Sequence, residues 1–237
     1  MQQAVVCLPT YNERENLERM IDALAPLGVR VLVIDDNSPD GTGELADRLA
    51  SERDWLSVLH RERKEGLGPA YIAGFREALR SDAEYVLEMD CDFSHDPADV
   101  PRLIKACADG ADLALGSRYV RGGGVENWGL HRRVLSRGAS IYTRIFLMPI
   151  HDASGGFKCF RREVLESIEL EKLGATGMVS FQVEMTYRAL RKGFRVVEVP
   201  IVFVDRTAGQ SKMTRAVALE AFARVPALRW AAMRRRL

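Results

Sequence analysis

The sequence has few of the features that mark disulfide-bonded, zinc-binding or membrane-spanning proteins. Its 237 residues include four cysteines, and no two of them form a CxxC pair, which argues against a disulfide framework and a zinc site. No uncharged apolar stretch approaches the roughly 20 residues that cross a bilayer. The first residues also lack the basic and apolar regions of a signal peptide. The sequence therefore predicts a cytoplasmic protein with reduced thiols and no transmembrane segment.

Neither sign of charge is in large excess. The formal net charge is +1, so the chain as a whole is not expected to attract nucleic acid or an anionic membrane. Hydrophobic residues make up 47% and charged residues 28%, values typical of globular proteins with a sizeable core. We therefore expect no nucleic-acid partner, and any electrostatic specialisation must come from local patches.

What the sequence does contain is an alternation of short β-branched runs and amphipathic helical patterns. This alternation is typical of βαβ units that feed a mostly parallel sheet. One later helix is expected over Leu130–Phe146. The expected strands are Ala4–Leu8, Val29–Asp35, Leu56–His60, Tyr85–Asp90, Leu113–Ser117 and Arg195–Val204. We therefore predict a single α/β domain with a Rossmann-like, nucleotide-binding front half.

Polar residues follow each of the first five expected strands. In an open α/β sheet, ligands bind outside the carboxyl ends of the strands. Turn formation and helix capping explain some of the polar residues in any one loop. They do not explain why five polar loops meet at one edge, so we expect the binding site there.

The sharpest signal is the stretch MDCDFSHDP, residues 89–97. Asp90 and Asp92 are alternate residues of an extended segment, so both carboxylates can face one hard cation. Such a cation can neutralise a diphosphate and stabilise it as a leaving group. Cys91 between them should point to the opposite side and pack in the core. The alternative interpretation of the stretch is a polar turn.

Asp36, at the end of the second expected strand, suggests a nucleotide contact. A carboxylate at this position can accept hydrogen bonds from ribose hydroxyls. The alternative is an Asx-turn that leads into the next helix. Both interpretations hold together if Asp36 faces the ligand and Asp40 caps the helix.

Eight stretches between Leu8 and Met213 resemble the family 2 glycosyltransferases, and within them the dolichyl- or polyprenyl-phosphate mannose synthases. The stretches are LPTYNERENL, VIDDNSPDGT, EGLGPAYIAGF, MDCDFSHDP, GSRYVRGGGVENW, HRRVLSRGAS, GGFKCFRR and VEVPIVFVDRTAGQSKM. The resemblance implies a nucleotide-sugar-binding, glycosyltransferase A-type fold over residues 1–213. It also implies transfer of mannose from GDP-mannose to dolichyl or polyprenyl phosphate, with inversion and with Mg²⁺ or Mn²⁺ as the cofactor.

The resemblance also assigns roles to single residues. The residues that match nucleotide-binding positions are Pro9, Tyr11, Glu13, Ile34 and Asp36. The residues that match the metal and donor-diphosphate positions are Asp90, Cys91, Asp92, Arg118, Arg206 and Lys212, with Ser94 as a further candidate metal ligand. The residues that match positions at the acceptor phosphate are Arg118, Arg132 and Ser136. The family commonly has alanine where this chain has Cys91.

A phosphate acceptor changes what the mechanism requires. A phosphate monoester is already an anion at neutral pH, so it needs no general base to activate it. Arginines must instead align it, and Arg118 and Arg132 are the candidates for this clamp. The bound cation, helped by Lys212, would stabilise the charge of the departing GDP. His95 is therefore expected to pack against the metal loop or bond a carboxylate, and not to act as the base.

Residues 214–237 and the exact reaction leave alternatives open. The segment is basic and amphipathic, which predicts either an interfacial helix at the cytoplasmic face of a membrane or a terminal helix packed on the domain. The sequence makes no prediction about a membrane-bound partner subunit. The alternative functions are a polyprenyl-phosphate glucosyltransferase or another nucleotide-sugar transferase, a haloacid dehalogenase-type phosphatase, and a non-catalytic nucleotide-binding module.

Overall fold

The computed structural model describes residues 3–173, 178–205, 225–226 and 228–230 of the chain. Two of the predicted donor-binding residues, Arg206 and Lys212, lie outside the described residues. The predicted domain boundary after residue 213 also lies outside them. The roles assigned to these two residues and this boundary stay predictions.

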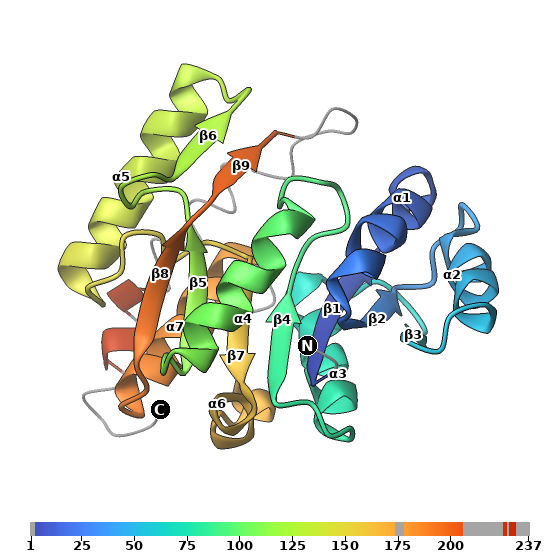
Figure 1. Ribbon diagram of the computed structural model, residues 1–237. Helices are drawn as coiled ribbons and strands as arrows, with labels where there is room; N and C mark the ends of the chain where they lie inside the picture. Colours follow the sequence, from blue (N-terminus) through green and yellow to red (C-terminus); the bar gives the residue numbers. More distant parts are fainter. Residues whose placement is uncertain (1–2, 174–177, 206–224, 227, 231–237) are drawn as a thin grey trace.

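A seven-stranded sheet with the order β3-β2-β1-β4-β7-β5-β8 forms the centre of the molecule (Figure 1). Its strands are β1 (Ala4–Thr10), β2 (Arg30–Asp35), β3 (Leu56–His60), β4 (Tyr85–Glu88), β5 (Leu113–Ser117), β7 (Lys158–Arg161) and β8 (Val196–Pro200). Only β7 runs antiparallel to its neighbours in this sheet, β4 and β5. The predicted α/β domain with a mostly parallel sheet is confirmed.

Helices cover both faces of the sheet, which explains why its strands are apolar on both sides. In β1, Val6 and Leu8 pack into one apolar cluster and Val5 and Cys7 into another. The helices that pack into the first cluster are α1 (Arg14–Leu24), α2 (Thr42–Ser51) and α4 (Val100–Ala108). The helices on the opposite face are α3 (Leu67–Leu79), α6 (Arg162–Ser167) and α7 (Met178–Arg191). The described part of the chain also contains the short 3-10 helices η1 (Ala25–Leu27), η2 (Pro97–Asp99) and η3 (Leu170–Lys172).

The expected strand over Arg195–Val204 is wrong in one respect, because the chain forms two strands there. β8 ends at Pro200, and β9 (Val202–Val204) pairs in parallel with β6 (Gly124–Glu126) in a separate two-stranded sheet. Between β8 and β9, the side chain of Ile201 is buried. Together with α5 (Leu130–Phe146), β6 and β9 form an extension beyond the carboxyl end of β8 (Figure 1).

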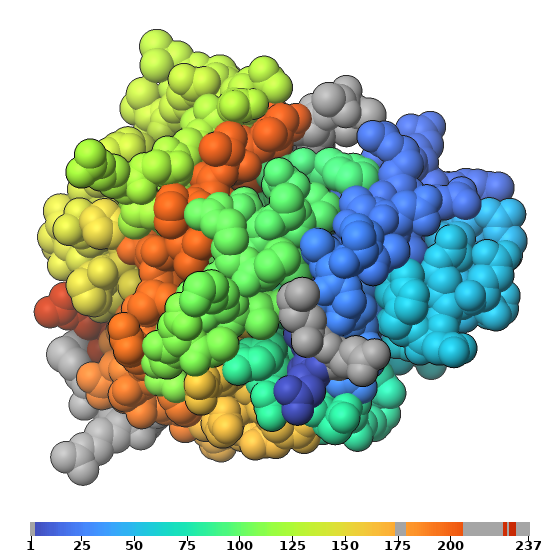
Figure 2. Space-filling view, in the orientation of Figure 1, coloured from blue at the N-terminus to red at the C-terminus, as the bar shows by residue number. Residues whose placement is uncertain are grey.

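Helix α5 packs with its small polar residues inward and its large apolar residues outward. Ser136, Ser140 and Thr143 are its buried residues. The exposed apolar residues of α5 are Leu130, Val134, Leu135, Ile141, Ile145 and Phe146, which are 49% to 78% exposed. The region of α5 and β6 projects from one side of the molecule (Figure 2). Among the described helices, none is long and apolar enough to cross a membrane.

A small part of the C-terminal segment predicted over 214–237 is described, at residues 225–226 and 228–230. Val225 and Leu228 are buried, and Leu228 belongs to an apolar cluster of the main body. Arg229 donates a hydrogen bond from Nη1 to the carbonyl of Phe146 at 2.7 Å. These contacts fit a segment that packs on the domain at this point, while an interfacial role for the whole segment stays a prediction.

Candidate active site

The turn after β2 is built around Asp35. Its Oδ1 accepts hydrogen bonds from Thr10 Oγ1 at 3.1 Å and from Ser38 Oγ at 2.6 Å, and its Oδ2 accepts from the Ser38 N–H at 3.0 Å. Asp40 accepts from both the N–H and the hydroxyl of Thr42, the first residue of α2. The expected Asx-type turn is therefore present. The N-cap of α2 is Gly41 and not Asp40 as expected, although Asp40, one residue earlier, accepts from the first N–H of the helix.

Asp36 lies at the same edge and is paired within the protein. Its Oδ1 is 2.5 Å from Arg61 Nη1, and the two side chains are only 7% and 11% exposed. Burial raises the pKa of the Asp36 carboxyl, although the charge of Arg61 opposes the shift. Arg61 directly follows β3, a position at the carboxyl edge that could have been noticed in the sequence but was not. A ribose hydroxyl bound by Asp36 would have to share it with this arginine.

The loop after β1 holds two of the predicted nucleotide-binding residues in local contacts. Lys64 Nζ is 3.8 Å from the centroid of the Tyr11 ring, which is a cation–π contact. The carboxylate of Glu13 accepts a hydrogen bond from Asn16 Nδ2 at 2.8 Å. Tyr11 and Glu13 are both partly exposed, so each presents a polar or aromatic surface at the carboxyl edge.

Pro9 and Ile34 are register partners in β1 and β2, so they lie within the sheet and not in the loop that carries Tyr11 and Glu13. The side chain of Ile34 is fully buried against α3. A Cβ atom on Gly74 would come within 2.5 Å of Ile34 Cδ1, so the helix approaches this close only because residue 74 is glycine. Ile34 can therefore contact a nucleotide through its backbone but not through its buried side chain.

The two aspartates of MDCDFSHDP lie in the loop that follows β4, which ends at Glu88 and not at Asp90 as predicted. Asp92 Oδ1 accepts a hydrogen bond from the Ser94 N–H at 3.0 Å, which folds the loop back on itself. Both aspartates are partly exposed. Cys91 is buried in the apolar cluster on the α1 side of the sheet, as expected.

The donor set of this loop fits a divalent cation whose coordination is completed by substrate. Within the described residues, no group of three or more histidine, cysteine, aspartate or glutamate side chains could hold a metal ion. Asp90 and Asp92 offer two carboxylates, and hard cations such as Mg²⁺ commonly take their other ligands from water and substrate phosphates. Ser94 Oγ is buried and has no hydrogen-bond partner among the described residues. This hydroxyl is a further oxygen ligand that the loop could offer, in addition to the two carboxylates.

His95 supports the loop and is not available as a base. Its Nδ1 accepts a hydrogen bond from the Asp90 N–H at 3.3 Å, which places the proton of the neutral ring on Nε2. The ring stacks on Phe157 with 5.0 Å between the centroids. Burial lowers the pKa of His95 to about 4, so the imidazole is neutral at pH 7. The expectation that His95 packs against the metal loop is confirmed.

Tyr71 is a contact of the loop that the sequence did not reveal. Its hydroxyl donates to Asp90 Oδ1 at 3.4 Å, and its fully buried ring stacks on Phe75 and Phe181. Burial raises the pKa of Tyr71 well above its usual value, so the hydroxyl keeps its proton. In the sequence, Tyr71 lies among the apolar residues of α3 and is indistinguishable from a core residue.

Arg118, which follows β5, is held by a buried carboxylate. Its Nε and Nη2 donate to Oδ2 and Oδ1 of Asp152 at 2.7 and 2.6 Å, and its backbone N–H donates to Oδ2 at 2.9 Å. Asp152 is fully buried. Glu198 of β8 accepts from the backbone N–H groups of His151 and Asp152 and from the Ser117 hydroxyl. Arg118 is therefore fixed in place, and its charge is balanced inside the protein.

Arg132 and Ser136 lie on α5 and reach the same region. Arg132 Nη1 is 2.6 Å from Asp205 Oδ2, and its Cζ is 4.1 Å from the centroid of the Trp128 ring. Ser136 is buried, and its hydroxyl accepts from Tyr119 Oη at 2.7 Å. The structure thus brings together all three residues predicted at the acceptor phosphate, and it adds Trp128 and Asp205 as neighbours.

Two contacts tie this extension to the metal loop. The Val204 N–H of β9 donates to the Ser94 carbonyl at 3.3 Å. Phe203, also in β9, lies edge-on to His95 with 5.4 Å between the centroids, and edge-on to Trp128 with 5.5 Å. Within the described residues, the aspartate loop is therefore in contact with the part of the molecule that carries Arg132 and Trp128.

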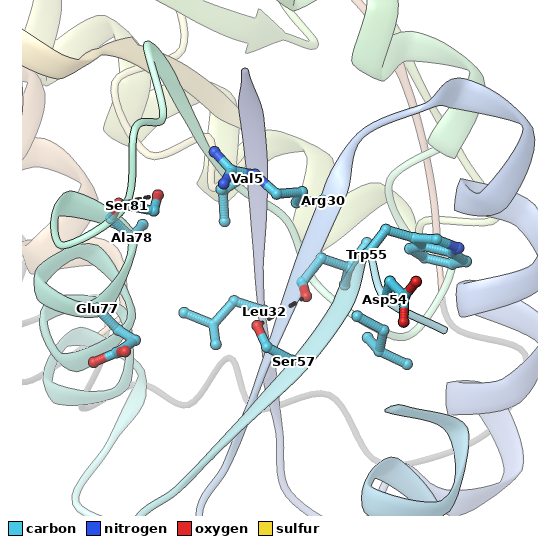
Figure 3. A pocket seen from close by; sticks show the side chains of 11 residues that line it. Val5, Arg30, Leu32, Asp54, Trp55, Ser57, Glu77, Ala78 and Ser81 are labelled. Atoms are coloured by element: carbon cyan, nitrogen blue, oxygen red, sulfur yellow. Dashed lines mark hydrogen bonds between the residues drawn. The ribbon is translucent and has the colours of Figure 1, made fainter. Parts of the chain in front are cut away.

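A cavity of about 150 Å³ lies at the opposite edge of the sheet (Figure 3). Its lining includes Val5, Arg30 and Leu56, which stand at the beginnings of β1, β2 and β3, and Trp55 and Glu77 also line it. The carboxyl ends of these strands, where the aspartates lie, are at the other edge. The cavity is therefore separate from the candidate active site.

The parallel sheet, the polar loops at its carboxyl edge and the paired aspartates define the class of nucleotide-sugar glycosyltransferases with an A-type fold. The family model described as "Glycosyl transferase family 2" matches residues 5–169, and the chain belongs to this family. The chain is thus a glycosyltransferase, and the phosphatase alternative is removed.

Two bacterial relatives are similar over nearly the whole chain. A protein named "Polyprenol monophosphomannose synthase" from Mycolicibacterium smegmatis is 49% identical over 228 residues, which cover 94% of this chain and 86% of that protein. A protein named "Undecaprenyl-phosphate mannosyltransferase" from Micrococcus luteus is 44% identical over 244 aligned positions, which cover 99% of each chain. Both names combine mannose with a phosphorylated polyprenol.

Solved structures share the fold at lower identity. Glucosyl-3-phosphoglycerate synthase from Mycobacterium tuberculosis has a TM-score of 0.70 and 20% identity, covering 94% of this chain and 79% of that one. A mannosyltransferase from Pyrobaculum calidifontis in complex with GDP-Man and Mn²⁺ has a TM-score of 0.60 and 21% identity, covering 88% of this chain and 58% of that one. These similarities confirm the predicted glycosyltransferase A-type fold.

Proposed function

We propose that this protein transfers mannose from GDP-mannose to dolichyl or another polyprenyl phosphate, with inversion at the anomeric carbon, and releases GDP. The names of the relatives at 49% and 44% identity support this proposal. The structural observation that carries it is the connection between the aspartate loop and the pair Arg118 and Arg132. This connection runs through Phe203 of β9 and Trp128. A transferase whose acceptor is an anion needs this arrangement of cations next to its donor site.

On the donor side, we assign Asp90 and Asp92 to a Mg²⁺ or Mn²⁺ ion, with Ser94 as a further candidate ligand. When bound, such an ion neutralises the diphosphate and stabilises it as a leaving group. Tyr71 and the Asp92–Ser94 hydrogen bond hold the two carboxylates in fixed directions. The Mn²⁺ and GDP-Man in the complex of the Pyrobaculum enzyme are consistent with this assignment.

On the acceptor side, the two arginines have different freedom to move. Asp152 is fully buried, so the bidentate pair with Arg118 stays closed. The partner of Arg132, Asp205, is 29% exposed, so Arg132 can exchange this carboxylate for a phosphate oxygen at a smaller desolvation cost. In our proposal, Arg118 receives the phosphate through Nη1, the guanidinium nitrogen that donates to neither Asp152 nor Ser154, and Arg132 closes on it. The phosphate oxygen then attacks without a general base, in agreement with the neutral, hydrogen-bonded state of His95.

The outward apolar face of α5 suits an acceptor with a lipid tail. A contiguous set of exposed apolar residues on one helix marks an interaction surface. The basic residues of α5 are Arg132, Arg133, Arg137 and Arg144, and this combination is typical of a helix that lies in a membrane interface. We therefore propose that α5 rests on the cytoplasmic face of the membrane that contains the acceptor. Its inward face carries Ser136 toward the site.

Adding charge to the apolar face of α5 should weaken membrane binding. We expect Val134→Glu/Ile141→Glu to reduce sedimentation with anionic liposomes at least about tenfold, because burial of two aliphatic side chains is lost. The control Ser51→Glu/Ala108→Glu adds the same charge at exposed positions of α2 and α4 and should sediment like the unmodified protein. Equal sedimentation of all three proteins would remove α5 from the membrane contact.

Donor choice provides the direct test of the proposed function. The purified protein is incubated with a radiolabelled nucleotide sugar, a polyprenyl phosphate and Mg²⁺ or Mn²⁺, and the lipid is extracted into organic solvent. We expect label in the lipid phase from GDP-mannose and not from other nucleotide sugars. Label from a glucose donor would instead support the polyprenyl-phosphate glucosyltransferase alternative. Absence of label from every donor would contradict transfer to a lipid phosphate altogether.

A further inference from the structure

Trp128 lies between β6 and α5 and contacts both arginines of the proposed acceptor site. The Cζ of Arg132 is 4.1 Å from the centroid of its ring, and the Cζ of Arg118 is 5.4 Å from it. The indole is only 6% exposed, so these contacts are largely shielded from water. Phe203 packs edge-on against the same ring. One buried side chain thus joins two cations that come from different elements.

Each guanidinium group is paired with its own carboxylate, so what remains to be explained is the distance between the two groups. The face of an aromatic ring attracts cations, tryptophan does so most strongly, and the attraction grows when water is excluded. The ion pairs to Asp152 and Asp205 balance the charges but lie on different segments, so they do not by themselves set the spacing between the arginines. Arg118 also lies near the rings of Tyr119 and Phe203, but Trp128 is the ring that both guanidinium groups contact.

Two hydrogen-bond donors at this contact are also unsatisfied. Trp128 Nε1 and Arg132 Nε are buried and have no hydrogen-bond partner among the described residues. A buried donor without an acceptor is unfavourable, and an anion that entered the site would offer oxygens to both groups. These two donors are therefore available to an anion that binds at this contact.

We infer that Trp128 is a positioning residue that holds Arg118 and Arg132 at the spacing needed to receive the acceptor phosphate. The inference rests on the proposed function, because it takes the phosphate of an isoprenyl lipid as the ligand. It goes beyond that function by assigning acceptor affinity to an aromatic side chain that carries no charge. Through Phe203 and His95, the same ring also fixes the arginines relative to the aspartate loop.

The test compares Trp128→Leu, which removes the aromatic face, with Trp128→Phe, which keeps a smaller one. Binding of a short-chain isoprenyl phosphate is measured by calorimetry, and KM is measured separately for the lipid phosphate and for GDP-mannose. We expect Trp128→Leu to weaken isoprenyl phosphate binding and to raise its KM about tenfold or more, as the loss of a desolvated cation–π contact predicts. KM for GDP-mannose should change less than about threefold. Trp128→Phe should recover most of the lost affinity.

Trp55→Leu is the matched control, because Trp55 lines the cavity at the opposite edge of the sheet (Figure 3). This variant should leave both KM values unchanged. A second measurement uses a double-mutant cycle of Trp128→Leu with Arg132→Lys, in which the effects on isoprenyl phosphate binding should be non-additive. Retained nucleotide binding in these variants guards against misfolding. The affinity for the nucleotide should be close to that of the unmodified protein in all three variants of the cycle.

Three results would overturn the inference. These are unchanged isoprenyl phosphate binding in Trp128→Leu, equal increases of both KM values, and strictly additive effects in the cycle. Failure of the proposed function has a different signature. If the unmodified protein transfers no mannose but still binds isoprenyl phosphate with the same dependence on Trp128, the donor assignment is wrong and the inference stands.

Discussion

Replacement of Asp92 by alanine should abolish mannosyl transfer, with kcat/KM reduced about a thousandfold or more. The described part of the loop offers two carboxylates to a cation, so the loss of either removes half of the charge that the protein contributes. A departing GDP then develops negative charge with little to stabilise it. The measurement is transfer of radiolabelled mannose to polyprenyl phosphate over a range of Mn²⁺ concentrations.

Asp92→Asn is the control that separates the charge of this residue from its structural contact. The asparagine keeps an oxygen that can accept from the Ser94 N–H, the hydrogen bond that Asp92 makes now. We expect the asparagine variant to unfold at the same temperature as the unmodified protein but to bind Mn²⁺ and GDP together much more weakly in calorimetry. Near-normal turnover in the alanine variant would exclude Asp92 as a metal ligand.

Replacement of Lys158 by methionine should lower the free energy of unfolding by about 3–5 kcal/mol, because it leaves a buried carboxylate without its partner. Lys158 of β7 and Glu88 of β4 are paired across the antiparallel register with 2.8 Å between Nζ and Oε1, and both side chains are fully buried. Gln182 of α7 also accepts a hydrogen bond from Lys158 Nζ. Urea denaturation followed by circular dichroism measures the change.

The pH dependence of this variant identifies the cause. Burial raises the pKa of Glu88 even with Lys158 present, and removal of the lysine takes away the main opposing charge. The folded variant then holds a proton on Glu88 that the unfolded chain releases above its ordinary pKa, so stability falls as pH rises. We expect the deficit to be smaller at about pH 5.5 than at about pH 8. A double variant Glu88→Leu/Lys158→Met should recover most of the stability, and a deficit that does not vary with pH would contradict the account.

The fold was largely predictable because its parallel strands are short apolar runs separated by helical patterns. β7 was not predicted because it is not such an apolar run: its sequence, KCFR, contains two basic residues in four. Lys158 is tolerated in a central strand only because Glu88 lies opposite it in β4, 70 residues earlier in the chain. The break between β8 and β9 was also missed, because PIVFV continues the β-branched pattern without a turn residue after Pro200.

The candidate site was predictable where one loop carries the chemistry and unpredictable where distant elements meet. Asp90 and Asp92 were found from their spacing and from the strand before them. The partners that orient the predicted residues were not found, because contacts such as Arg118–Asp152 and Arg132–Asp205 join residues 34 and 73 positions apart. The sequence shows which groups can do the chemistry, and the tertiary structure shows what holds them.

The outward apolar face of α5 has a consequence for how the enzyme meets its acceptor. In the proposed orientation, a helix that packs inward through Ser136, Ser140 and Thr143 and outward through large apolar groups would hold the protein at a lipid surface by partition. Enzyme and acceptor then diffuse in the same plane, while the sugar nucleotide arrives from the aqueous phase. On this proposal, the rate of turnover would depend on the number of acceptor molecules per unit area of membrane. Adding inert lipid would then slow the reaction, as dilution with water slows an enzyme whose substrates are dissolved.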